Sequence, residues 1–262
     1  NTSVFLTALI ILFSQSFWMI AVVAEVYTLN ILGICLIIYF AIRWVKTGQE
    51  KFLFLVTFLY GLSIGVHGGM VIFFPCFFLF FLLVEWQKYP INFEQLLKKT
   101  IILSFLFILG FSVFLFLPIR SNSNPSFDTG NPETLPRFIN HLIDKKDSAS
   151  FFSDVSGAFS LTKNVKQISK LIINELTLIG FLCGIIGFFY HIKSHKKTFL
   201  LCFLLFSVNI LFFLASKHRP FTDSIIFLPS IIIFSFWIGS GIYKIAETIS
   251  NFLFGYYFKM AF

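Results

Sequence analysis

The sequence predicts an all-α integral membrane protein that crosses the bilayer several times. Hydrophobic residues make up 57% of its 262 residues and charged residues only 12%, and its mean hydropathy is +0.88. A water-soluble domain of this length could not bury so much apolar surface in one core. Apolar runs long enough to cross a bilayer recur along the chain, with short basic segments between them.

The predicted spans follow from length, because about 20 apolar residues cross the hydrocarbon core as one helix. We expect one partial transmembrane domain over residues 1–262. The loops on both sides of residues 52–84 are basic, so an even number of crossings or a re-entrant hairpin lies between them, with its turn in a glycine-rich stretch. Residues 249–262 are a truncated further span or an interfacial helix. The predicted spans are residues 4–20, 22–42, 52–66, 70–86, 100–117, 171–190, 198–215 and 222–243.

The formal net charge of +8 does not indicate nucleic acid as a partner, because of where the charge lies. Lysine and arginine gather in short loops between apolar runs, at residues 43–51, 88–99 and 193–197. This is the positive-inside pattern of a membrane protein, and it places these loops on the cytoplasmic side. Membrane lipid is therefore the partner that the charge predicts.

A long polar segment, residues 119–170, is predicted to form a loop on the non-cytoplasmic side. Its opening is rich in turn-forming residues. From Leu135 to Lys146, apolar side chains recur at helical spacing opposite polar ones. This pattern predicts an amphipathic helix that lies on the outer membrane interface.

Glu25 is a single carboxylate inside an apolar stretch that runs from Val4 to Ile42. An ionisable group at membrane depth costs about 2.5–3.5 kcal/mol and usually faces a cavity, a partner or a substrate. In the predicted topology Glu25 emerges on the non-cytoplasmic side, and so do His67, Arg120 and the Lys217–Arg219 turn. We therefore expect these polar groups to cluster in space.

Several short motifs follow one another in a characteristic order. The motifs are Phe17-Trp18, Ala24-Glu25-Val26-Tyr27 with Asn30, Gly61-Leu62-Ser63 with Gly65 and His67, Leu117-Pro118-Ile119-Arg120, Asn124-Pro125, and Gly130, Pro132 and Phe138. In order and spacing this set resembles the protein O-mannosyltransferase-like membrane family of the GT-C glycosyltransferase superfamily. The resemblance covers most of Phe13 to Lys146.

The resemblance implies a GT-C-like helical bundle that moves a sugar, mannose in some members, from a polyprenyl-phosphate donor to a protein or glycan acceptor. The site would face the non-cytoplasmic side of the plasma membrane in a bacterium or of the endoplasmic reticulum in a eukaryote. The lipid-linked sugar is then a substrate, the cofactor is unknown, and a need for a divalent cation is open. Family members carry their principal catalytic base in an acidic N-terminal outer loop that this chain does not contain, so we expect this piece to be inactive alone.

Within that family pattern, Glu25 is the predicted catalytic residue. It would orient the acceptor, bind a metal or hold a donor-binding arginine, whereas the alternative is an ion pair at the interface. Tyr27 and Asn30 add hydrogen-bonding capacity beside it. His67 would donate to the carrier phosphate or line the sugar pocket, although a lone histidine is often structural.

Three cations are further candidates for substrate binding. Arg120 follows a span end directly, where a guanidinium could grip phosphate with two hydrogen bonds. Lys217 and Arg219 present the same chemistry. For all three the alternative is a side chain that snorkels to the interface. Asp128, in a turn-rich stretch, is predicted to cap the chain locally.

Two other classes of function remain open on the sequence alone. A transporter also places isolated charges in apolar helices, but its site lies near the membrane midplane between paired broken helices. The Glu25 segment has no repeat elsewhere in the chain, and the polar groups collect at one face. A noncatalytic scaffold of a membrane assembly would need no pocket for a lipid phosphate. The four cysteines have no metal-ligand spacing, and no metal site is predicted from them.

Overall fold

The computed structural model describes residues 2–23, 25–87, 93–128, 130–143, 161–215 and 220–260, and within these residues it holds helices and no β-strand. The chain divides into two compact units. One unit contains Asn1–Ala24, Ser160–Ile210 and Pro220–Phe262, and the other contains Glu25–Phe159 and Leu211–Arg219. The helical part of the sequence prediction is confirmed.

In the described part of the chain, six helical segments are long and apolar enough to cross a membrane. They are Tyr27–Thr47, Gly68–Trp86, Phe93–Ser121, Asn174–Ser194, Lys196–Leu214 and Ile225–Phe252. A bent pair of helices near the N-terminus would make a seventh span if it counts as one. A polytopic all-α membrane protein is therefore confirmed as the fold class.

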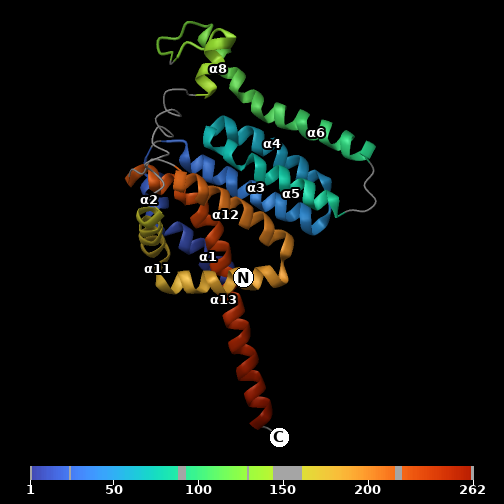
Figure 1. The fold of residues 1–262 in the computed structure, drawn as a ribbon, viewed down its shortest axis with the longest axis vertical. Coiled ribbons are helices and arrows are strands. Elements are labelled where there is room, and N and C mark those ends of the chain that lie inside the picture. The colour runs from blue at the N-terminus through green and yellow to red at the C-terminus, as the bar shows by residue number, and fades with distance from the viewer. Residues whose placement is uncertain are drawn as a thin grey trace. The chain divides into compact units, whose positions relative to one another are not determined.

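Four helices lie alongside one another in the unit that begins at Glu25 (Figure 1). They are α3 (Tyr27–Thr47), α4 (Glu50–Val66), α5 (Phe74–Trp86) and α6 (Phe93–Phe111). Helices α4 and α6 touch backbone to backbone, since a Cβ atom added to Gly61 would meet the carbonyl oxygen of Phe107, and one added to Gly110 would meet that of Phe58. Small residues allow such close approach between helices in a membrane.

At one end of these helices, an ion-pair cluster joins α4, α5 and α6. The Nζ atom of Lys99 on α6 pairs with Glu50 at the start of α4, and it lies 3.0 Å from an Oε atom of Glu85 near the end of α5. The cluster fixes the register of three helices at the end where the basic loops lie.

At the other end, α4 stops at His67 and the chain turns back into α5. His67 has an extended backbone, with φ −149° and ψ 116°, and cannot continue the helix. A short 3₁₀ helix, η1 (Gly68–Phe73), follows and leads directly into α5. Pro75 stands in the first turn of α5, where its missing N–H costs nothing. The result is the hairpin between basic loops that the charge pattern requires.

The segment after α6 remains helical before it reaches the polar loop. The 3₁₀ helix η2 (Ser112–Leu115) and α7 (Phe116–Ser121) continue α6, and α8 (Leu135–Ile143) follows after an irregular stretch. Helix α8 falls within the predicted amphipathic helix at residues 135–146, and residues 144–146 lie outside the described part. Its place on the membrane interface stays a prediction.

The other unit begins with two short helices where we expect one span over residues 4–20. Helix α1 (Thr2–Leu12) and helix α2 (Gln15–Ala21) are bent by 59°. The break lies at Ser14, whose side-chain oxygen accepts a hydrogen bond of 3.1 Å from the backbone N–H of Phe17 and so caps α2. A serine cap lets a new helix start in a new direction, because it satisfies a donor that the break leaves open.

The remainder of this unit is built from long helices. These are α11 (Leu161–Ser194), the part of α12 (Lys196–Ala215) up to Ile210, and α13 (Pro220–Met260). Helix α11 kinks at Thr177, which has a positive φ of 58°. Helices α11 and α13 cross in backbone contact, since a Cβ atom on Gly187 would meet the carbonyl oxygen of Trp237. Helix α13 runs on past the predicted end at residue 243, without a break before residues 249–260.

The buried fraction differs most between the spans formed by α13 and by α6 with its extension. In the span Ile225–Phe252, 67% of the most apolar window is buried, against 6% in the span Phe93–Ser121. Helix α13 is therefore the centre of its own unit, and α6 with its extension exposes most of its apolar side chains. Such a surface is expected of a helix that faces lipid.

Candidate functional site

The predicted site residues Tyr27 and His67 meet where α3 begins and α4 ends. Their ring centroids are 5.6 Å apart, with an angle of 52° between the ring planes. The two helices run antiparallel and pack closely here, because a Cβ atom on Gly33 of α3 would lie 2.7 Å from the hydroxyl oxygen of Ser63 on α4. Residues 40 positions apart in sequence are thus in contact, whereas the expected clustering of Glu25, Arg120 and the Lys217–Arg219 turn with His67 stays a prediction.

His67 is held in one orientation by its own turn. Its Nδ1 atom accepts a hydrogen bond of 3.0 Å from the backbone N–H of Gly69 and so caps η1. Burial lowers the pKa of His67, which favours the neutral ring. A neutral imidazole that accepts at Nδ1 carries its proton at Nε2. His67 therefore presents a hydrogen-bond donor that its turn does not use.

Asn30 lies one helical turn after Tyr27 on α3 and contributes an acceptor. Its Oδ1 atom is buried and has no hydrogen-bond partner among the described residues. A buried carbonyl oxygen without a donor is uncommon and costs about 1–3 kcal/mol. A ligand hydroxyl would satisfy it. Tyr27, Asn30 and His67 together are called the α3–α4 cluster below.

Glu25 directly precedes this cluster in the chain and belongs to neither helix. It is exposed, in a bend two residues before α3 begins, and within the described residues it makes no hydrogen bond or ion pair. The expected burial cost at membrane depth is therefore absent. Val26, the residue that caps α3, makes no side-chain hydrogen bond. The carboxylate of Glu25 lies near the same helix end, where a negative charge interacts favourably with the positive end of the helix dipole.

Arg120 lies on α7, in the stretch that follows α6. The end of α4 packs against this stretch, because a Cβ atom on Gly65 would meet the side chain of Val113 in η2. The Arg120 side chain is exposed and forms no ion pair with any described residue. Beside it, the hydroxyl of Ser121 donates to Asp128 over 2.5 Å, which is a local contact between side chains; the predicted capping by Asp128 stays a prediction.

Lys217 and Arg219 fall outside the described residues, and their assignment to substrate binding stays a prediction. Within the described residues, no group of three His, Cys, Asp or Glu side chains lies close enough to hold a metal ion.

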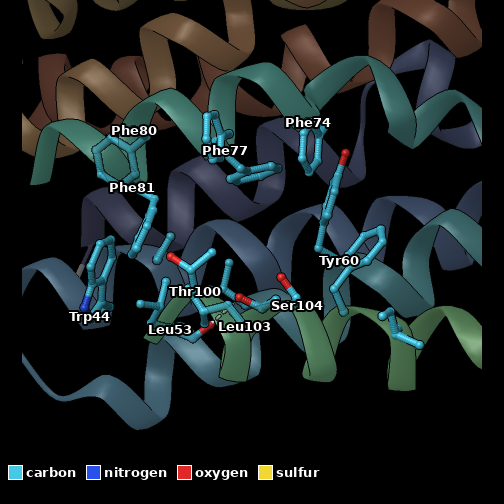
Figure 2. A pocket seen from close by; sticks show the side chains of 16 residues that line it. Trp44, Leu53, Tyr60, Phe74, Phe77, Phe80, Phe81, Thr100, Leu103 and Ser104 are labelled. Carbon is cyan, nitrogen blue, oxygen red and sulfur yellow. Dashed lines mark hydrogen bonds between the residues drawn. The ribbon is translucent and has the colours of Figure 1, made fainter. Parts of the chain in front are cut away.

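An apolar cavity of 410 Å³ lies between α3, α4, α5 and α6 (Figure 2). Trp44, Phe80 and Phe81 stand at one end, and Tyr60 and Phe74 at the other (Figure 2). Its hydroxyl groups are largely used by the backbone, with that of Thr57 bonded to Leu53 O, that of Thr100 to Leu96 O and that of Tyr60 to Met70 O. The cavity therefore suits a hydrocarbon occupant.

The cavity and the α3–α4 cluster are neighbours through η1. The hydroxyl of Tyr60, at one end of the cavity, donates to the carbonyl oxygen of Met70 over 2.7 Å. The backbone N–H of Met70 in turn donates to the carbonyl oxygen of His67 over 3.0 Å. An apolar cavity and a polar cluster thus adjoin within one unit, which is an arrangement for an amphipathic ligand.

One chemically important residue was missed by the sequence predictions. Glu175 on α11 is 9% exposed and its carboxyl oxygens accept from Ser16: both lie 3.1 Å from the backbone N–H, and one lies 2.5 Å from the hydroxyl. These bonds satisfy the start of α2, which indicates a structural role. An isolated acid in the predicted span 171–190 was a visible signal, but its partner lies 159 residues away.

In a comparison with protein families, the model of the Protein O-mannosyl-transferase TMEM260 N-terminal domain matches residues 1–116. Comparison with curated proteins and with solved structures gives no match. The matched residues include the α3–α4 cluster, Glu25 and most of the helices around the apolar cavity. The match supports a protein O-mannosyltransferase-like glycosyltransferase in a membrane. Through its first 116 residues, the chain fits a protein O-mannosyltransferase-like membrane family.

Proposed function

We propose that this chain is part of a GT-C type glycosyltransferase that transfers a sugar from a polyprenyl-phosphate donor to a protein or glycan acceptor. The observation that carries the proposal is the α3–α4 cluster within the segment that matches a protein O-mannosyl-transferase domain. It offers an unused donor at His67 and an unused acceptor at Asn30, beside an apolar cavity. The donor substrate combines the same three chemistries: phosphate, hydroxyl groups and hydrocarbon.

The donor would lie with part of its polyprenyl chain in the cavity and its phosphate near His67. The Nε2–H group of His67 and the guanidinium of Arg120 are donors for phosphate oxygens, and such charge-assisted bonds are among the strongest in proteins. A sugar hydroxyl would satisfy the buried Oδ1 atom of Asn30, with Tyr27 lining the same position. Lys217 and Arg219 are proposed as further phosphate contacts.

In the proposed reaction, an acceptor oxygen forms a bond to the anomeric carbon of the sugar while the bond from that carbon to the phosphate oxygen breaks. The polyprenyl phosphate leaves with the electron pair, and the acceptor proton goes to a base. We assign Glu25 to orienting the acceptor hydroxyl, because it is exposed, directly precedes the cluster in the chain and has no ion pair in the described part of the chain. In the family resemblance, the principal base lies in an N-terminal outer loop.

The transfer is proposed to occur on the non-cytoplasmic side. The positive-inside pattern puts the basic loops, and with them the Lys99 ion-pair cluster, on the cytoplasmic side. His67 and Tyr27 lie at the opposite ends of α3 and α4. The membrane would be the plasma membrane in a bacterium and the endoplasmic reticulum in a eukaryote, and mannose is the sugar that the family name favours.

The test is donor consumption by the full-length protein in membranes supplied with a radiolabelled polyprenyl-phosphate sugar. We expect the label to leave the lipid fraction, and Glu25→Gln to slow this by at least tenfold without lowering the amount of folded protein. The matched control is Glu94→Gln, which alters another exposed acid, one that pairs with Lys98 on the surface of α6. No donor consumption by well-folded wild-type protein would contradict the proposal and favour a transporter or a scaffold.

A further inference from the structure

A second cavity, of 530 Å³, lies in the other unit, between α1, α13 and the end of α11. It is separate from the α3–α4 cluster and from the apolar cavity beside it, and the proposed reaction does not use it. Its lining changes character from one side to the other. The wall formed by α1 is mostly apolar, with Val4, Ala8 and Ile11 beside a single hydroxyl group at Thr7, whereas the wall near the end of α11 carries histidine and tyrosine side chains.

The polar wall is an organised cluster of rings. The ring centroids of His191 and His195 are 5.4 Å apart, and that of Tyr190 lies 6.1 Å from that of His195 and 6.2 Å from that of Tyr243. The hydroxyl oxygen of Ser240 on α13 lies 3.0 Å from the Nε2 atom of His191 and joins the two helices across the cavity. These contacts link the polar side chains near the end of α11 with those of α13.

The rim of that end is basic. His195 lies in the short connection between α11 and α12, where Lys193, Lys196 and Lys197 are all exposed. No carboxylate lines the cavity. Glu247 on α13 is paired with Lys244 over 2.6 Å, and it accepts a hydrogen bond of 3.5 Å from the hydroxyl of the lining residue Tyr243. The candidate spans Asn174–Ser194 and Lys196–Leu214 meet at this connection, which puts it at the membrane surface.

We propose that this cavity binds an anionic phospholipid, with an acyl chain against the α1 wall and the phosphate at the His195–Lys196 rim. An anionic ligand is favoured by charge, because the rim is basic and no acid lines the cavity. The apolar wall selects an amphipathic anion over a free one, because inorganic phosphate would leave the side chains of Val4, Ala8 and Ile11 uncovered. Lysines beside a span end typically attract acidic lipids. This site is additional to the transferase function and independent of it.

The test uses the full-length protein in phosphatidylcholine vesicles that contain a trace of a photoactivatable lipid, either phosphatidylglycerol or phosphatidylcholine. Crosslinked peptides are then mapped by mass spectrometry. We expect phosphatidylglycerol to label α1 and α13 around the cavity, and phosphatidylcholine to label them weakly. Lys196→Gln should lower the phosphatidylglycerol label roughly fivefold, the effect of one lysine near a charged surface. Ala8→Trp, which fills the apolar side, should abolish it.

Each control can overturn the proposal. Lys98→Gln changes an exposed lysine in another basic segment, and an equal loss of label there would show general attraction to surface charge. Displacement of the label by inorganic phosphate would show a free-anion site, and equal labelling by both lipids would show a nonselective one. Lys196 is exposed, so its replacement tests the proposal even if Ala8→Trp fails to fold, which circular dichroism would reveal.

Discussion

Glu25 and Glu175 each stand in an apolar stretch of this chain, and the structure places them in opposite environments. Glu175 is buried and bonded to Ser16, whereas Glu25 is exposed and has no partner in the described part of the chain. Glu175→Ala would leave the N–H and the hydroxyl of Ser16 without acceptors at the start of α2. We therefore expect this substitution to destabilise the protein, and Glu25→Ala to cost no more than the roughly 0.3–1 kcal/mol of an exposed charge at a helix N-terminus.

The magnitude follows from the two donors that lose their acceptor. An unsatisfied buried donor costs about 1–3 kcal/mol, so the loss is roughly 2–6 kcal/mol in the free energy of unfolding. At about 2–4 °C per kcal/mol for a chain of this size, Tm should fall by roughly 5–20 °C. Glu175→Gln can keep the one oxygen that accepts from both donors of Ser16 and should therefore lose less.

Thermal unfolding in detergent, followed by circular dichroism, measures this difference. Glu94→Ala is the matched control, because its exposed i, i+4 pair with Lys98 is worth less than about 1 kcal/mol. If Glu175→Ala unfolds at the wild-type temperature, the carboxyl group does not hold the start of α2 and the assigned structural role is wrong. Donor consumption per folded molecule should also stay near wild type in Glu175→Gln, in contrast to Glu25→Gln.

Three further predictions address the unit that contains the site. Gly61→Val should destabilise the protein by about 1–3 kcal/mol, because the added side chain would clash with the backbone of α6. Gly68 has open space around it, so Gly68→Ala should not destabilise the protein. Equal Tm values for the two variants would contradict the close contact between α4 and α6. Because burial lowers the pKa of His67, the unfolded state binds the proton more readily, and the stability of the protein should fall as pH drops below about 6.5. His67→Gln, which keeps an acceptor for Gly69, should lose this pH dependence. If the dependence of Tm on pH is unchanged in this variant, His67 is not its source. Asn30→Leu should have a Tm equal to or above that of the wild type, because it removes an unsatisfied buried oxygen. The same variant should have a higher KM for the sugar donor. An unchanged KM would show that Asn30 does not bind the donor.

The fold class could be predicted from the sequence because it depends on local composition and topology. Apolar runs and basic loops predict spans and their direction, and a hairpin between two basic loops brings His67 back to the level of Tyr27. The 5.6 Å between these rings shows that Tyr27 and His67 meet. The catalytic and binding roles of the site residues remain predictions.

The details that could not be predicted depend on contacts between distant segments. The break between α1 and α2 is stabilised by Glu175, whose position beside Ser16 no local pattern encodes. For the same reason, the exposure of Glu25 and the burial of Glu175 could not be distinguished, since each is one acid in an apolar run. The orphaned oxygen of Asn30 likewise depends on how α3 and α4 pack.

The central claim is that the sugar donor binds at the α3–α4 cluster with its hydrocarbon in the neighbouring cavity. Photocrosslinking with a polyprenyl-phosphate sugar that carries the photoactivatable group in its chain tests this directly, with the labelled peptides mapped in the full-length protein. We expect label on the cavity-lining residues of α5 and α6, and we expect unlabelled donor to reduce this labelling by competition. Label confined to other segments, in protein that still consumes the donor, would contradict it.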